Sequence, residues 1–379
     1  MDELIRLEAG FAVASDTFCV VFSGTDNDDT YSYILTYEGK LRQPWSRVDV
    51  PRKIAGLTGK LNSEGRPVIY AVSDEGDIYI VSPGRPSYHT EIDGAGVYSE
   101  NATGLGYINA AALVGDTVLV TGYHSQLYSI IGEKTEWFER DKLPLAPKGF
   151  EYLAFGSIGG SSVEDLYMTV LYLPENSARS LTDDEKERRS ELIKQGRYEE
   201  ALDLEESAKQ GPTRVNEGRL HHWDGTQWRV VATPRSGKFY PEPSVLSDIL
   251  IENPDRVWSV GNNGVILVGN ARDGFQDISF KGNDENLRSL TKFRDRMVIA
   301  SDYALHWFDG HMLSPLKPNI DPTINKSVPT PLKVQAVDDT LYYFDSKHGV
   351  YTFNGRDWKA MEVPQELLQR EFKGLKNDL

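Results

Sequence analysis

The sequence predicts an all-β protein in which about seven similar units of four short strands follow one another. Three observations predict it: the composition, a turn motif that recurs, and the spacing of that motif. The 379 residues include 33 Gly, 19 Pro, 19 Tyr and 7 Trp but one Cys. Turn-forming glycine and proline together with many aromatic residues favour short strands joined by tight turns over long helices.

The recurring motif is an aromatic residue, an acidic or amide residue, a glycine and then a tryptophan, with a proline after it. Trp223–Trp228 and Phe353–Trp358 are the clearest copies, and looser copies surround Gly39 and Gly310. Asp-Gly and Asn-Gly supply the positive φ angles that a tight turn between antiparallel strands needs. Alternating apolar runs precede these turns, so each unit is interpreted as four strands.

The spacing of the turn glycines supports a repeat architecture. One glycine represents each unit: Gly39, Gly84, Gly132, Gly225, Gly274, Gly310 and Gly355. All intervals but one lie between 36 and 49 residues, and the long one, of 93 residues, spans an insertion at 175–217. A period of about 45 residues with four strands per unit is typical of a β-propeller. A pair of β-sandwiches is the alternative, but sandwiches lack a motif at the same place in every unit.

Because its blades contain turns such as Trp223–Trp228, the chain resembles bacterial WD40-like and Kelch-like propellers. The resemblance covers most of the chain and implies a fold, not a particular function. The Gly-His and Trp-Asp signatures of true WD40 repeats are absent, so six or eight blades stay open beside seven. The first and last units each contain four strands, so no strand needs to be shared between the termini.

The predicted domain is a propeller over residues 1–364 with a C-terminal tail at 365–379. Within the insertion, the pattern predicts a helical hairpin over 182–210, begun by a capping box of Thr182 and Glu185. Its helices are expected to pack through Leu192, Ile193, Tyr198, Ala201, Leu202 and Leu204. Two roles stay open for the hairpin: a solvated spacer and a partner-contact element.

Charge and cysteine content exclude several classes of function. With 41 Lys+Arg against 57 Asp+Glu the net charge is −16, which disfavours nucleic acid and anionic membranes as partners. A single cysteine, Cys19, excludes an internal disulfide and a cysteine zinc cage. The N-terminus lacks a signal peptide and no apolar run is long enough to span a membrane. We therefore expect a cytoplasmic monomer.

No catalytic, metal or cofactor motif stands out, so we expect a protein that is not an enzyme and has no cofactor. The acidic run Asp26–Asp29 fails the calcium-loop template, because Tyr31 stands where glycine belongs. His221 and His222 are neighbours on a predicted strand and point to opposite faces. We expect one of them to pack in the core and the other to face solvent.

The preferred hypothesis is a non-catalytic module that binds a basic protein through acidic, aromatic loops. The candidate partner-binding residues are Asp26, Asp28, Asp29, Tyr31, Tyr123, Asp183, Asp184, Tyr198, Glu199, Glu200 and Tyr240. As an acidic binding module, the chain resembles bacterial immunity proteins that neutralise basic, nuclease-like antibacterial toxins. The alternative is a lactonase-like or sugar-active propeller enzyme with a site at the central channel.

Overall fold

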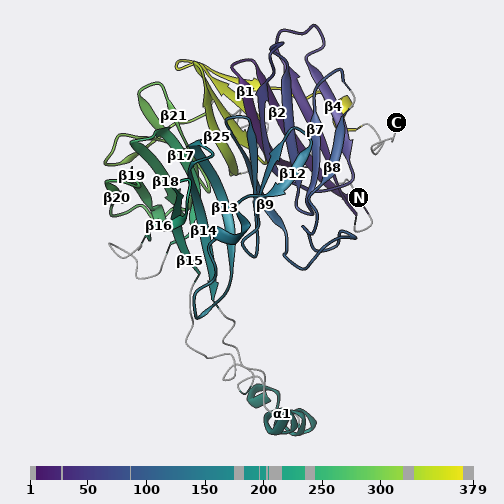
Figure 1. The fold of residues 1–379 in the computed structure, drawn as a ribbon, viewed down its shortest axis with the longest axis vertical. Helices are drawn as coiled ribbons and strands as arrows, with labels where there is room; N and C mark the ends of the chain where they lie inside the picture. Colours follow the sequence, from purple (N-terminus) through teal and green to yellow (C-terminus); the bar gives the residue numbers. More distant parts are fainter. Residues whose placement is uncertain are drawn as a thin grey trace.

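The computed structural model is a ring of seven four-stranded antiparallel sheets (Figure 1), which confirms the predicted β-propeller. The structure describes residues 6–26, 29–85, 87–174, 183–195, 197–201, 204, 216–234, 244–318 and 328–369. In this part of the chain, no helix is long and apolar enough to span a bilayer.

Each sheet, or blade, is formed by four consecutive strands, and we number the blades from the N-terminus. Blade 1 comprises β1 (Arg6–Ala14), β2 (Thr17–Asp26), β3 (Asp29–Glu38) and β4 (Trp45–Val50). Blade 2 comprises β5 (Ile54–Leu61), β6 (Pro67–Ser73), β7 (Asp77–Val81) and β8 (Tyr88–Glu91). Blade 3 comprises β9 (Ile108–Val114), β10 (Thr117–Gly122), β11 (Leu127–Ile131) and β12 (Lys134–Trp137).

Blades 4 to 7 comprise β13 (Phe150–Ser162), β14 (Asp165–Pro174), β15 (Glu217–Trp223) and β16 (Trp228–Ala232); β17 (Leu246–Asn253), β18 (Arg256–Gly261), β19 (Ile266–Asn270) and β20 (Gly274–Asp277); β21 (Leu287–Phe293), β22 (Arg296–Ser301), β23 (Leu305–Phe308) and β24 (Leu313–Pro315); β25 (Pro331–Val337), β26 (Thr340–Asp345), β27 (Gly349–Phe353) and β28 (Trp358–Met361). The chain also forms the α-helices α1 (Asp183–Lys194) and α3 (Gln365–Leu368) and the short 3-10 helices η1 (Arg140–Lys142) and η3 (Asn262–Gly264).

The recurring turn motif lies where the blades need it. Each of the seven glycines used for the spacing belongs to a different blade: six stand between its third and fourth strands, and Gly274 is the first residue of the fourth strand, β20. Six of the seven have positive φ. The tryptophan after the turn opens the fourth strand and packs on the end of the third. Trp358 stacks on Phe353 with ring centroids 4.8 Å apart, and Trp228 lies 5.7 Å from Trp223.

The ring closes without a shared strand, as expected. The first strands of the blades form the inner ring, each touches the next, and β25 of the last blade touches β1 of the first. The side chain of Gln335 bridges this last joint. Its Oε1 accepts from the Ala12 amide at 2.9 Å and its Nε2 donates to the Ala12 carbonyl at 2.9 Å.

A second contact closes the same joint on the outside of the ring. After β28 the chain crosses to blade 1, where α3 packs Leu367 and Leu368 against the core cluster shared by blades 1 and 7. Arg47 of β4 is buried there, donates to the Leu367 carbonyl and pairs with Asp49. The predicted tail therefore begins with a packed helix, and its residues after 369 lie outside the described part.

The insertion in blade 4 is helical where it is described. Helix α1 lies apart from the blades, beyond the ends of β14 and β15 (Figure 1), and residues 198–201 begin a second helical stretch. Leu192 and Ala201 are buried, in line with the expected packing of two helices. The expectation for Tyr198 is wrong, because 62% of its surface is exposed. The capping residue Thr182 lies outside the described residues.

Candidate functional site

The two faces of the propeller carry different connections. In an antiparallel blade, the connections from the second to the third strand leave at the same end as those from the fourth strand to the next blade. This end, which we call the long-loop face, carries the 92–107 and 138–149 connections and the helical insertion. The short turns with the motif glycines leave at the opposite end, the short-turn face.

Exposed aromatic side chains gather on the long-loop face. Among the described residues, four aromatic side chains are exposed by more than a third, and each belongs to a connection on this face: Tyr98 (82%), Tyr107 (37%), Tyr198 (62%) and Tyr303 (62%). Leu145, in the 138–149 connection, is also 82% exposed. Tyrosine is enriched in protein-binding surfaces, because it offers a large rigid contact area together with a hydroxyl.

The loop that presents Tyr98 is held in place by one carboxylate. Glu75, in the turn between β6 and β7, accepts through Oε2 from the amides of Val97, Tyr98 and Ser99 at 2.9, 2.8 and 3.0 Å. Gly96 precedes them with a φ of +87°, and a Cβ there would lie 2.5 Å from that oxygen. The backbone around Tyr98 is thus preorganised, which lowers the entropy cost of using its ring in binding.

Contacts link Tyr98 to four further residues, and we call this group the tyrosine patch: Tyr98, Tyr107, Tyr123, His124 and Tyr152. A hydrogen bond with Tyr98 raises the pKa of the Tyr107 phenol above its ordinary value. The Tyr107 carbonyl accepts from the Tyr123 amide at 3.0 Å. The ring of Tyr152 lies 6.0 Å from Tyr123 and stacks on His124 at 4.4 Å.

The turn at the centre of the tyrosine patch has an unusual backbone. His124 and Ser125 both have positive φ, 50° and 62°, although neither is glycine. Such conformations cost on the order of 1–3 kcal/mol per residue and persist only where the surroundings enforce them. Here the His124 ring bonds the Leu105 carbonyl at 2.8 Å and Ser125 Oγ donates to the Pro144 carbonyl at 2.9 Å. Unlike an Asn-Gly turn, this one presents an imidazole ring to Tyr152.

Carboxylates surround the tyrosine patch. Asp74 and Glu75 lie beneath the 92–107 loop, Asp93 and Glu100 are exposed on that loop, and Glu151 is exposed beside Tyr152. Burial raises the pKa of Asp74, an effect that the nearby Lys53 opposes. A surface that combines tyrosine rings with carboxylates is suited to lysine and arginine side chains, through ion pairs and cation–π contacts.

The structure brings one predicted partner-binding residue into this patch, Tyr123, which is half-buried. Tyr31 is instead 7% exposed and packs 5.2 Å from Tyr33 in the core between blades 1 and 7. Tyr31 belongs to β3, where it points to the buried face of the strand and not to a loop. Its place in the core therefore argues against the predicted partner contact.

The remaining predicted residues stay a prediction. Asp26 and Asp29 are the last residue of β2 and the first of β3 on the long-loop face. Asp183 and Asp184 begin α1, and Glu199 and Glu200 are exposed beside Tyr198. Two further predicted residues, Asp28 and Tyr240, lie outside the described part of the chain. Tyr98, Tyr107, His124 and Tyr152 were missed, although the four glycines of the 92–107 connection mark it as a long structured loop.

A second polar feature is a carboxylate–histidine pair that recurs in several blades. His89 bonds Asp77 at 3.0 Å and His222 bonds Asp165 at 2.7 Å. Asp77, His89 and Glu91 also lie close enough to hold a metal ion. However, Asp77 already accepts from Arg52 and Ser73, and the guanidinium charge opposes a cation. These pairs are best explained as structural ties within the blades.

The expectation that one of the two adjacent histidines faces solvent is wrong. His221 and His222 are 3% and 6% exposed, on opposite faces of β15. The ring of His221 bonds the Tyr172 hydroxyl at 2.9 Å, and its burial, together with the nearby Arg219 charge, lowers its pKa to about 4. Both faces of this strand are covered because neighbouring blades pack on either side.

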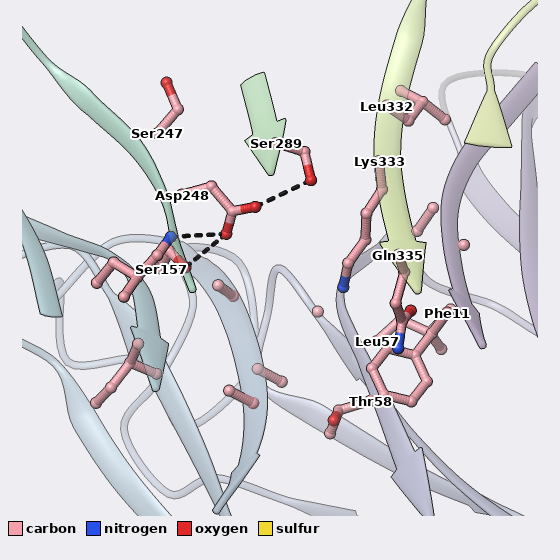
Figure 2. A pocket seen from close by; sticks show the side chains of 18 of the residues that line it. Phe11, Leu57, Thr58, Ser157, Ser247, Asp248, Ser289, Leu332, Lys333 and Gln335 are labelled. Carbon is pink, nitrogen blue, oxygen red and sulfur yellow. Dashed lines mark hydrogen bonds between the residues drawn. The ribbon is translucent and has the colours of Figure 1, made fainter. Parts of the chain in front are cut away.

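The axial channel has a volume of about 690 Å³, and residues of all seven inner strands lie in its wall. Side chains join these strands across the blades (Figure 2). The carboxylate of Asp248 accepts from Ser157 Oγ at 3.1 Å and Ser289 Oγ at 2.9 Å, and also from the amides of Ile249 and Leu290. It thereby connects blades 4, 5 and 6.

The channel lacks the set of carboxylates that a lactonase-like metal site would need. Asp248 is the one carboxylate among the residues that line it, and its pKa is raised by burial. The other charged residues in the wall are Arg288, which pairs with Asp302, and Lys333, which lies over the ring of Phe11 at 4.9 Å. The wall is otherwise made of small, apolar and neutral polar residues.

Comparisons with known proteins agree with the fold. No protein-family model and no curated protein matches the sequence. The WD40 β-propeller domain of Doa1 is similar with a TM-score of 0.53 and 11% identity, over 94% of this chain and 95% of that one. YCF48 from Cyanidioschyzon merolae is similar with a TM-score of 0.51 and 11% identity, over 92% and 95%.

The extracellular domain of BT4673 from B. thetaiotaomicron has a TM-score of 0.52 and 12% identity over 93% of this chain, which spans 38% of that domain. A further structure shows YCF48 bound to D1 peptide, with a TM-score of 0.52 and 10% identity over 94% of each chain. At these identities the likeness shows the fold alone, a seven-bladed propeller of WD40-like type.

Proposed function

We propose that this propeller is a protein-binding module whose long-loop face binds a basic partner through the tyrosine patch and the carboxylates around it. The observation that carries the proposal is the gathering of every strongly exposed aromatic side chain of the described residues on one face. A net charge of −16 favours a basic partner and speeds its association. YCF48, a propeller of similar fold, has been solved with a bound peptide.

We further propose that the partner is a basic, nuclease-like antibacterial toxin and that the chain acts in the bacterial cytoplasm as its immunity protein. A nuclease must attract phosphate, so its active site is basic. An acidic surface with protruding aromatic rings can cover such a site and block the substrate. The supporting features are the charge, the preorganised loop around Tyr98 and the absence of a catalytic motif in the sequence.

The test is a binding experiment with the protein encoded beside this chain's gene, measured at about 0.05 M and 0.5 M salt, where screening differs strongly. We expect Tyr98→Ala to weaken binding by about tenfold or more, as for a central interface tyrosine. Glu100→Lys should slow association at low salt. Met312→Ala and Asp339→Lys are matched controls, because both residues are exposed on the short-turn face.

Two outcomes would argue against the proposal. If the controls weaken binding as much as the patch variants, the long-loop face is not the interface. If binding is strong but does not change with salt, the partner is not recognised through its basic charge, and the toxin hypothesis is lost. Cytochrome c, a basic protein unrelated to toxins, measures how much binding comes from charge alone.

A further inference from the structure

The axial channel holds a cation that no described residue neutralises at close range. Lys333 lines the channel from β25, and Figure 2 shows its Nζ directed into the open space of the channel, with no hydrogen bond to Asp248. Within the described residues, no carboxylate lies within ion-pair distance of this Nζ and no hydrogen-bond acceptor is assigned to it. An ammonium group has three donors, so a partly buried one needs acceptors from elsewhere.

Asp248 does not supply hydrogen-bond acceptors to the Lys333 ammonium group. Its two oxygens already accept four hydrogen bonds, two from hydroxyls and two from backbone amides, which point them toward blades 4 and 6. Its charge still stabilises Lys333 at longer range, whereas burial lowers the pKa of the lysine. The contact that the Lys333 Nζ makes is with the Phe11 ring at 4.9 Å.

We propose that the axial channel binds a small organic monocarboxylate, whose carboxylate pairs with Lys333 and whose apolar part lies against Phe11 and Leu57. The channel volume of about 690 Å³ is within the range of small-molecule sites. One cation matches a single negative charge, whereas a phosphate dianion would leave a charge uncompensated opposite Asp248. This site is separate from the long-loop face and goes beyond the proposed function.

The experiment is a titration of the full chain by calorimetry with three probes, acetate, butyrate and benzoate, and with methyl benzoate as the uncharged match. We expect saturable binding that is strongest for benzoate and absent for the ester. Lys333→Met keeps the length of the side chain and removes the charge. A hydrogen-bonded charge pair contributes roughly 1.5–3 kcal/mol, so this variant should bind about 10- to 100-fold more weakly.

Lys134→Met is the matched control, since Lys134 is exposed on β12 and loses the same charge. It should bind benzoate as the unaltered chain does. The proposal is overturned if no probe binds up to about 10 mM, if the ester binds as well as benzoate, or if Lys333→Met binds unchanged. The melting temperature, followed by tryptophan fluorescence, serves as the readout of correct folding in Lys333→Met and does not involve the proposed partner, so the two proposals fail independently.

Discussion

The joint between blades 7 and 1 should depend on one side chain, Gln335. It makes two hydrogen bonds of 2.9 Å with the amide and carbonyl of Ala12, a residue 323 positions away that is 2% exposed. Gln335→Met keeps the length and removes both bonds. Two lost bonds cost about 1 kcal/mol each, and buried groups left without a partner cost a further 1–3 kcal/mol, so we expect about 3–5 kcal/mol in all.

The expected change in melting temperature follows from the size of the chain. At about 2.1 cal/mol/K per residue, cooperative unfolding of 379 residues has an entropy of about 0.8 kcal/mol/K. A loss of about 3 kcal/mol therefore corresponds to a decrease of about 4 °C, measured by calorimetry and by urea unfolding followed through tryptophan fluorescence.

Gln276→Met is the control, because Gln276 is exposed on the outer strand β20. It should change the free energy of unfolding by less than about 0.5 kcal/mol. If Gln335→Met has the same melting temperature as this control, the hydrogen bonds of Gln335 do not hold the ring closed. The closure would then rest on the apolar core between the two blades.

Three further predictions concern packing, a buried ion pair and pH. Gly10→Ala should destabilise the fold by about 1–3 kcal/mol, because a Cβ there would lie 2.1 Å from the buried Phe344 ring; an unchanged urea midpoint would contradict this. Arg47→Ala removes the cation that pairs with the buried Asp49 carboxylate and should lower the free energy of unfolding by about 3–5 kcal/mol. Arg47→Lys should recover only part of this loss of stability. Because the folded pKa of His221 is lowered to about 4, its contribution is complete above about pH 6.5 and is lost as the pH falls toward 4, by about 3 kcal/mol at most. His221→Gln should flatten this dependence, and an equally steep profile in the variant would assign it to other groups.

The fold could be predicted from the sequence because its signals are local. A turn such as Asp224-Gly225 is decided by the backbone preferences of two residues, and the tryptophan that follows packs on the strand next to it in the chain. Since each blade is made of consecutive strands, repeating this local unit is enough to indicate a propeller of about seven blades, whereas the exact number follows from the structure. The helical insertion was equally visible, because its residues break the alternation of the strands.

The site could be predicted only in its general character. The acidic charge and the aromatic loops were visible, but Tyr31 is buried because blade 7 packs over its strand, and His222 is buried because blades cover both faces of β15. Tyr98 is 82% exposed because Glu75, from another connection, fixes its loop.

Composition and local turns determined that this chain is an acidic propeller of about seven repeating units. Which tyrosines reach solvent, and which lysine faces the axis, was decided by the tertiary structure. Both depend on which blades meet when the ring closes, and such contacts join residues that are far apart in the chain and share no pattern along it.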